Sequence, residues 1–142
     1  MAQRFAIALL VALAATSCGG GPVDPSKNQV ETRSGIVQPS LIDVPLPPFT
    51  ISNLGEFSVV VTALTPGNVF VGVGWGQWTG SGCGLIPGQT NIVSSANIGR
   101  TVLSGQIFIK GDYCVAIFDG SLSFGSPPLT VAQNYTIQVS HP

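Results

Sequence analysis

Alternation of apolar and polar residues predicts β-strands along most of the second half of the chain. Segment 57–64 places Phe57, Val59, Val61 and Ala63 at every second position, which is the period of a strand with one buried face. The final segment, 135–140, alternates in the same way. Other short apolar segments are separated by turn residues and are expected to be strands as well: 49–51, 83–86, 91–93 and 101–109.

Segment 69–78 has the strictest alternation. Valines and Trp75 occupy one face, whereas Gly72, Gly74 and Gly76 occupy the other. Glycine inside a strand often marks the close approach of another group. One interpretation is a flat floor for a ligand, with Trp75 and Trp78 as stacking platforms for a sugar ring. The other, which we favour, is that bulky side chains of a neighbouring strand lie across the glycines.

Segment 111–120 predicts the central strand of the fold. Its middle, from Tyr113 to Phe118, is a continuous apolar run rich in β-branched and aromatic residues, which is typical of burial on both faces. Lys110-Gly111-Asp112 separates it from segment 101–109. We therefore expect these two strands to form an antiparallel hairpin.

Together these segments predict roughly seven or eight short strands, with turn residues about every 8–12 positions. Such spacing is typical of an all-β, antiparallel β-sandwich. We expect this domain to occupy residues 49–142.

The first 17 residues predict a signal peptide. Arg4 precedes an unbroken apolar run from Phe5 to Ala15, and that run is shorter than the about 20 residues that a membrane-spanning helix needs. Ala15-Thr16-Ser17-Cys18 resembles the bacterial lipobox, in which the cysteine is lipidated. An ordinary signal cleaved nearby, with Cys18 free, is the alternative. Because Gly19 is not Asp, the resemblance implies a cell-envelope location, at the outer membrane or the cell surface.

Residues 18–48 predict a flexible tether rich in Gly and Pro. A coil of this length reaches on the order of 30 Å, and the only regular element expected within it is a short strand near 36–41. Five prolines interrupt any longer element: Pro25, Pro39, Pro45, Pro47 and Pro48.

Charged residues are scarce, which argues against functions that need clusters of charged side chains. They make up 8% of the 142 residues, against about 25% in a typical protein, and the formal net charge is −1. Nucleic acid is not an expected partner, because no basic patch is present to neutralise phosphates. The only histidine, His141, is the penultimate residue, where chain ends usually fray, so we expect no Ser-His-Asp arrangement.

The three cysteines suggest one disulfide. If a lipid takes Cys18, then Cys83 and Cys114 remain as a pair, and an oxidising compartment permits their bond. Closing this loop would stabilise the fold by about 3–4 kcal/mol through the entropy of the unfolded chain.

Two further segments resemble the end of the bacterial pre-peptidase C-terminal type of domain: Gly111-Asp112-Tyr113-Cys114-Val115-Ala116-Ile117-Phe118-Asp119 and Asn134-Tyr135-Thr136-Ile137-Gln138-Val139-Ser140-His141-Pro142. The stretch from Gly76 to Cys83 is similar to the matching G-x-W-x-G-x-x-C segment. The resemblance implies a jelly-roll-like sandwich that serves as an accessory module on secreted proteins. Variants of the family carry Arg where this chain has Ala116, so any role of that Arg is absent here.

The expected function is therefore a lipid-anchored, non-catalytic module with a structural or interaction role. Its expected partners are the membrane, through Cys18, and a glycan or an envelope protein. A carbohydrate-binding module that uses Trp75, Trp78 and Tyr113 is the alternative, and an accessory domain of a secreted hydrolase is a weaker one. No cofactor is expected, and Asp112 and Asp119 are only weak candidates for a calcium site.

Overall fold

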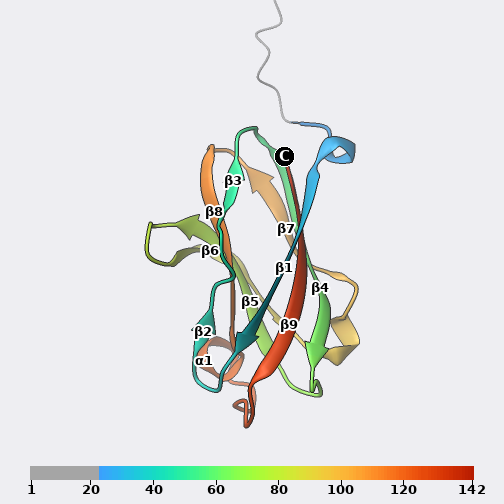
Figure 1. Cartoon of the computed structure of the whole chain (residues 1–142), viewed down its shortest axis with the longest axis vertical. Coiled ribbons are helices and arrows are strands. Elements are labelled where there is room, and N and C mark those ends of the chain that lie inside the picture. Colours follow the sequence, from blue (N-terminus) through green and yellow to red (C-terminus); the bar gives the residue numbers. More distant parts are fainter. Residues whose placement is uncertain (1–22) are drawn as a thin grey trace, which may run out of the picture.

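A computed structural model describes residues 23–142, which form two antiparallel sheets packed face to face (Figure 1). The first sheet has the order β1 (Gln29–Val37), β9 (Gln133–His141), β4 (Gly55–Thr65) and β7 (Thr101–Ile107). The second has the order β2 (Ile42–Asp43), β8 (Gly111–Asp119), β5 (Val71–Trp78) and β6 (Cys83–Val93), with β3 (Phe49–Ile51) also paired to β8. One turn of α-helix, α1 (Ser121–Phe124), and two 3₁₀ turns, Pro25–Lys27 and Ser95–Asn97, complete the described elements.

The order of the strands is that of a jelly roll. β2 and β3 pair with the same strand and together act as one interrupted strand. When β2 and β3 are counted as one strand, every connection passes from one sheet to the other, except the β5–β6 hairpin. Eight strand positions joined in this way form the double-sheet jelly roll. The predicted antiparallel, jelly-roll-like β-sandwich is confirmed.

The hairpin predicted between segments 101–109 and 111–120 is wrong. β7 pairs with β4 in the first sheet, whereas β8 pairs with β5, β2 and β3 in the second. Each of the two strands has an apolar inner face, so they bury those faces from opposite sheets. The short turn between them therefore crosses from one sheet to the other.

The predicted tether also needs correction, because part of it belongs to the sandwich. All nine residues of β1 pair with β9, from Gln29 opposite His141 to Val37 opposite Gln133. Pro25 lies in the 3₁₀ turn before β1, and the prolines at 39, 45, 47 and 48 lie in connections after it, so none of these interrupts the strand. The domain therefore includes the described chain from Val23, which bridges Gly55, and does not begin at residue 49.

β8 lies at the centre of the second sheet and is buried on both faces, as its continuous apolar run predicts. Tyr113, Val115 and Ile117 face the core between the sheets, and Cys114, Ala116 and Phe118 on the other face are also buried. A strand inside such a fold normally has one solvated face. The outer face of β8 must therefore be covered by other parts of the chain.

The glycines of β5 allow neighbouring side chains to pack closely against the outer face of this sheet. A Cβ atom on Gly72 would lie 2.0 Å from the ring of Phe118, and one on Gly74 would lie 2.7 Å from the side chain of Leu85. These contacts confirm the interpretation that neighbouring side chains lie across the glycines. The ligand-floor interpretation of this face is wrong, since residues 71–76 are buried.

Gly76 has a more specific role, because the backbone of β6 passes over it. A Cβ atom there would lie 2.3 Å from the carbonyl oxygen of Gly84. By curling across β5 at this point, β6 brings Cys83 to Cys114 on β8, with a Cα–Cα distance of 5.7 Å. The predicted disulfide is confirmed, and it connects two strands that are separated in the sheet by β5.

We expect Gly76→Ala to destabilise the protein by about 1–3 kcal/mol, because the added methyl group would press against backbone that cannot rotate away. Denaturant unfolding and titration of free thiols measure the change in stability and the closure of the disulfide. Gly82→Ala is the matched control, since a Cβ atom there meets nothing within 4 Å. Equal stability of the two variants, with no free thiol in either, would contradict this role of Gly76.

Candidate functional site

A groove of about 360 Å³ opens where the edge strands β6 and β7 of the two sheets face each other. Its floor is formed by aromatic side chains from three strands: Phe57, Trp75 and Tyr113. Amide side chains line its walls: Gln77, Gln89 and Gln106. Apolar residues form its lip: Ile86, Phe108 and Ile109.

An irregularity in β6 shapes the groove. Gly74 pairs with Thr90 and Gly76 pairs with Leu85, so four residues of β6, 86–89, bulge out opposite a single residue of β5. Pro87 and Gly88, which has a φ of +79°, lie in this bulge and suit its turn. The bulge carries Ile86 and Gln89 to the groove.

The aromatic floor is a stack that belongs to the core. Trp75 lies between Phe57, at a centroid distance of 4.2 Å, and Tyr113, at 5.3 Å, with nearly parallel rings. Only 1% of Trp75 and 4% of Tyr113 are exposed. Neither ring offers a free face, so the prediction that they act as stacking platforms is wrong. The strand period that places Trp75 in line with Val71 and Val73 also places it between the sheets.

The structure does not bring Trp78 to the other two predicted platform residues. Trp78 is half-buried at the end of β5, opposite Cys83. It lies an odd number of residues from Trp75, and successive side chains of a strand point to opposite faces. Trp78 therefore lies on the outer face of the sheet, away from the groove.

The lip of the groove contains the most exposed apolar side chains of the region. Phe108 is 78% exposed and Ile109 is 63% exposed. The phenol of Tyr113 donates a hydrogen bond of 2.8 Å to the carbonyl oxygen of Ile109, which fixes the lip to the floor. None of the nine lining residues described by the structure is Asp, Glu, His, Lys or Arg. The groove therefore suits an uncharged ligand that combines apolar surface with hydrogen-bonding groups.

The two acids considered for calcium lie at opposite ends of β8. Seven residue steps separate Asp112 from Asp119, which is about 23 Å along a strand. Asp112 accepts a hydrogen bond of 2.7 Å from Thr50 at the surface. A single calcium site that uses both carboxylates is therefore wrong, and the described residues contain no cluster of three or more potential ligands.

Asp119 instead holds the β1–β2 loop, the start of α1 and the loop before β9 together. Its buried carboxylate accepts hydrogen bonds from the backbone N–H groups of Ser40 at 2.9 Å, Ser121 at 3.0 Å and Leu129 at 3.1 Å. Burial alone would raise the pKa of Asp119, but these donors outweigh it and hold the pKa below its ordinary value. The carboxylate is therefore a structural anion.

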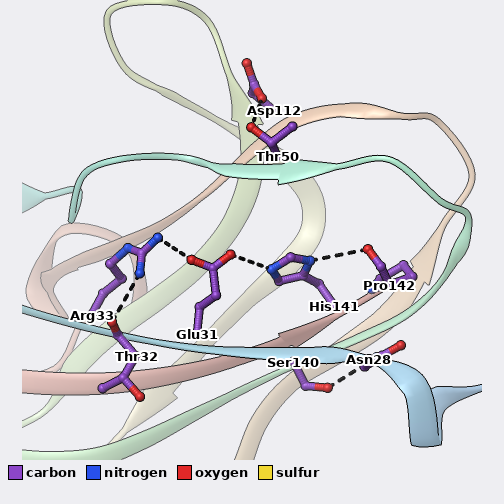
Figure 2. A network of polar contacts seen from close by, with 9 residues as sticks. All are labelled: Asn28, Glu31, Thr32, Arg33, Thr50, Asp112, Ser140, His141 and Pro142. Atoms are coloured by element: carbon purple, nitrogen blue, oxygen red, sulfur yellow. Dashed lines mark hydrogen bonds and ion pairs between the residues drawn. The ribbon is translucent and has the colours of Figure 1, made fainter.

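A polar network near the C-terminus was not anticipated from the sequence (Figure 2). His141 is only 1% exposed and its Nε2 donates a hydrogen bond of 2.8 Å to Glu31, whose other oxygen pairs with Arg33. The guanidinium of Arg33 lies 5.1 Å from the ring centre of Phe49, and the His141 ring packs edge-on against the same phenylalanine. The prediction that His141 is frayed is therefore wrong.

Partial burial alone would raise the pKa of Glu31, but the hydrogen bonds from His141 and Arg33 lower it below its ordinary value. A signal for this network does exist in the sequence. His141 continues the inward period of Tyr135, Ile137 and Val139 on β9. An inward polar residue needs a buried partner, and that partner lies on β1, which the sequence pattern did not reveal as a strand.

Tyr135 and Asp43 form a second internal pair. The Tyr135 hydroxyl donates to the carboxylate of Asp43 at 2.5 Å. Burial, and then the hydrogen bond and negative charge of Asp43, raise the pKa of Tyr135. Gly35 on β1 leaves room for both groups, because a Cβ atom there would overlap each of them. The pair therefore joins the first sheet to β2 of the second.

Comparison with protein-family models finds no match, and comparison with curated proteins finds none either. Within residues 23–142, no helix has the length and apolar character needed to cross a bilayer. The predicted signal peptide (1–17) and the predicted lipidation site, Cys18, lie outside the described residues.

The depressed pKa values of Asp119 and Glu31 predict acid sensitivity. A carboxyl whose pKa is lower in the folded state stabilises the fold fully above its unfolded pKa of about 4. That contribution is lost as the pH falls through the folded pKa. We expect thermal unfolding temperatures to drop steeply once the pH falls below about 4.

In Asp119→Asn the drop should be shallower, and stability at pH 7 should be lower by about 1–3 kcal/mol because the three N–H donors lose an anionic acceptor. Asp112→Asn, at the exposed end of the same strand, is the control and should behave like the wild type. An unchanged pH profile in Asp119→Asn would show that Asp119 does not contribute in this way.

Proposed function

We propose that this protein is a lipid-anchored, non-catalytic β-sandwich module of the bacterial cell envelope with an interaction role. In this proposal residues 1–17 direct export and Cys18 carries the lipid. Its location is the outer membrane or the cell surface, as the residue after Cys18 indicates.

The observation that carries the proposal is the state of the cysteines. Cys83 and Cys114 are bonded to each other, so they account for two of the three cysteines of the chain. Such a bond is typical of proteins folded in an oxidising compartment. The remaining cysteine, Cys18, follows an apolar run and three small residues, which is where a lipobox would place it.

A binding role, and not catalysis, is supported by the way ionisable side chains are used. His141 and Glu31 bond to each other, Asp119 is saturated by backbone donors, and Asp43 holds Tyr135. These groups stabilise the ends of the sandwich. The resemblance to the pre-peptidase C-terminal type of domain also favours an accessory module, and the jelly-roll topology agrees with it.

The position of Val23 implies that the sandwich lies close to the lipid. The backbone N–H of Val23 donates to the carbonyl of Leu54, so the described fold begins there. Five residue steps separate Cys18 from Val23 and span at most about 18 Å. The proposed anchor is thus much shorter than a tether ending at residue 48.

Mass spectrometry of the protein purified from bacterial membranes tests the anchor. We expect a mature chain that begins at Cys18 and carries the added mass of a diacylglycerol and an acyl chain. Because one disulfide is closed, no thiol should react with an alkylating reagent. Cys18→Ala should not acquire the lipid mass, whereas Ser17→Ala, the control, should still acquire it. A mature chain that begins elsewhere, or an alkylated Cys18, would refute lipidation.

A second candidate function is sugar binding, which the groove favours. Amides donate and accept hydrogen bonds, so Gln77 and Gln89 suit the hydroxyl groups of a neutral sugar. Phe108 on the lip is 78% exposed, and its ring can contact the apolar face of a sugar. This arrangement differs from the predicted one, because the exposed aromatic is Phe108 and not a tryptophan.

Titration with chitobiose, cellobiose and maltose tests the second candidate. In a Trp78→Phe background the fluorescence of Trp75, which lines the groove, should change saturably with one of these sugars. Phe108→Ala or Gln77→Ala should abolish the change, and Gln138→Ala, at an exposed position on β9, should preserve it. No saturable change at millimolar concentrations of any of the three would exclude sugar binding of this kind.

A further inference from the structure

Large exposed apolar side chains gather at the end of the sandwich farthest from Val23. We call this surface the distal cap. It includes α1 and β2, which lie at the bottom of Figure 1, opposite the end where the chain enters the fold. Six side chains, 39–58% exposed, define it: Leu41, Ile42, Phe70, Leu122, Phe124 and Val131.

Backbone hydrogen bonds hold the segments of the cap together. The N–H of Asp119 donates to the carbonyl of Leu41 at 3.2 Å, and that of Gly120 donates to the carbonyl of Phe70 at 3.3 Å. Phe124 on α1 stacks on Phe118 of β8, at a centroid distance of 6.3 Å. The cap therefore rests on the end of the central strand.

Side-chain hydrogen bonds make the cap rigid as well. The carboxylate of Asp119 holds the loops at Ser40 and Leu129 and the start of α1 at Ser121. Gln133 accepts from the N–H of Gly67 and donates to the carbonyl of Val131, which ties the β4–β5 connection to the loop before β9. A preorganised surface loses little conformational entropy on binding.

The loops of the cap carry no charged residue, and the two carboxylates beside them are bonded internally, Asp43 to Tyr135 and Asp119 to backbone N–H groups. Segments 38–42, 66–70 and 120–132 contain no Asp, Glu, Lys, Arg or His. In a two-fold interface the same patch is present on both partners, so any charge near its centre would face a like charge. An uncharged apolar patch avoids this repulsion and is compatible with its own copy.

The size of the cap is also compatible with self-association. Taking about 200 Å² for a fully exposed large side chain, the six residues expose roughly 600 Å². This is at the upper end for an apolar patch on a monomer. Two such patches would bury roughly 1,200 Å², the lower limit for a specific interface. An interface of this size predicts a reversible dimer that depends on concentration.

We propose that the distal cap is the interface of a two-fold dimer formed with a second copy of this chain. This inference deepens the proposed interaction role by identifying the partner, and it does not depend on lipid at Cys18. The free edge of β1 is a poorer interface, because an edge strand with inward-pointing charges resists pairing. Glu31 and Arg33 are such charges, and Arg33 also donates to the carbonyl of Thr32 on that edge.

Sedimentation equilibrium of the soluble chain 19–142, which contains every described element, tests the proposal. The average mass should rise from that of a monomer toward that of a dimer as concentration increases through the micromolar range. Leu122→Asp and Leu41→Asp should each weaken association about tenfold or more, because an interfacial charge would be buried without a partner. Phe108→Asp, which adds the same charge at an exposed apolar residue outside the cap, should associate like the wild type.

Near-ultraviolet circular dichroism, to which the packed stack of Phe57, Trp75 and Tyr113 should contribute, verifies that each variant is folded. A wild-type chain that stays monomeric throughout would overturn the proposal. A dimer that tolerates both cap variants would also overturn it. Loss of that dimer in Val30→Lys would place the interface on the β1 edge, and loss in Phe108→Asp would place it at the groove. The dimer is measured on the soluble chain 19–142, and lipidation is measured on the protein from membranes. Either proposal can therefore fail without changing the test of the other.

Discussion

The structure depends on burial of both faces of β8. Its inner face meets the core between the sheets, and its outer face is covered by the disulfide to Cys83 and by Phe124. Each end of the strand then organises one end of the molecule. Tyr113 fixes the lip of the groove near its start, and Asp119 fastens the loops at its finish. One strand thus positions the groove, the covalent crosslink and the distal cap.

β5 makes this burial possible, because its glycines add no side chains to the outer face. Phe118 lies over Gly72, Leu85 lies over Gly74, and the backbone of Gly84 crosses Gly76. The stability that glycine costs in a strand is offset by apolar contacts and by the crosslink. The same strand places Trp75 on its inner face, where the aromatic stack joins the two sheets.

Strands with apolar inner faces could be predicted from the sequence, and those without could not. β4 and β9 alternate clearly, and the apolar run of β8 correctly indicated double burial. The sequence of β1 resembles a tether because its inner positions are Glu31, Arg33 and Gly35, and its partner β9 lies about a hundred residues away. The pairing of β7 and β8 could not be predicted either, because a short turn suits both a hairpin and a crossing between sheets.

The candidate site was predictable only in part, for a related reason. Sequence periodicity placed Trp75 on one face of its strand, but whether that face meets solvent or another sheet depends on the packing of the whole domain. The groove arises from the bulge of β6 and from the lip at Phe108, and neither has a periodic signature. The disulfide was predictable because the chain has few cysteines.

The ladder between β1 and β9 also has a mechanical consequence. The chain enters β1 at one end of the sandwich, and the distal cap lies at the other, so tension between the two acts parallel to the strands. A pull along β1 loads its nine residue pairs with β9 simultaneously, in shear, and does not open them one after another. Peeling would require a force directed across the sheet. The fold is therefore oriented to bear load between the point where the chain enters and whatever holds its far end.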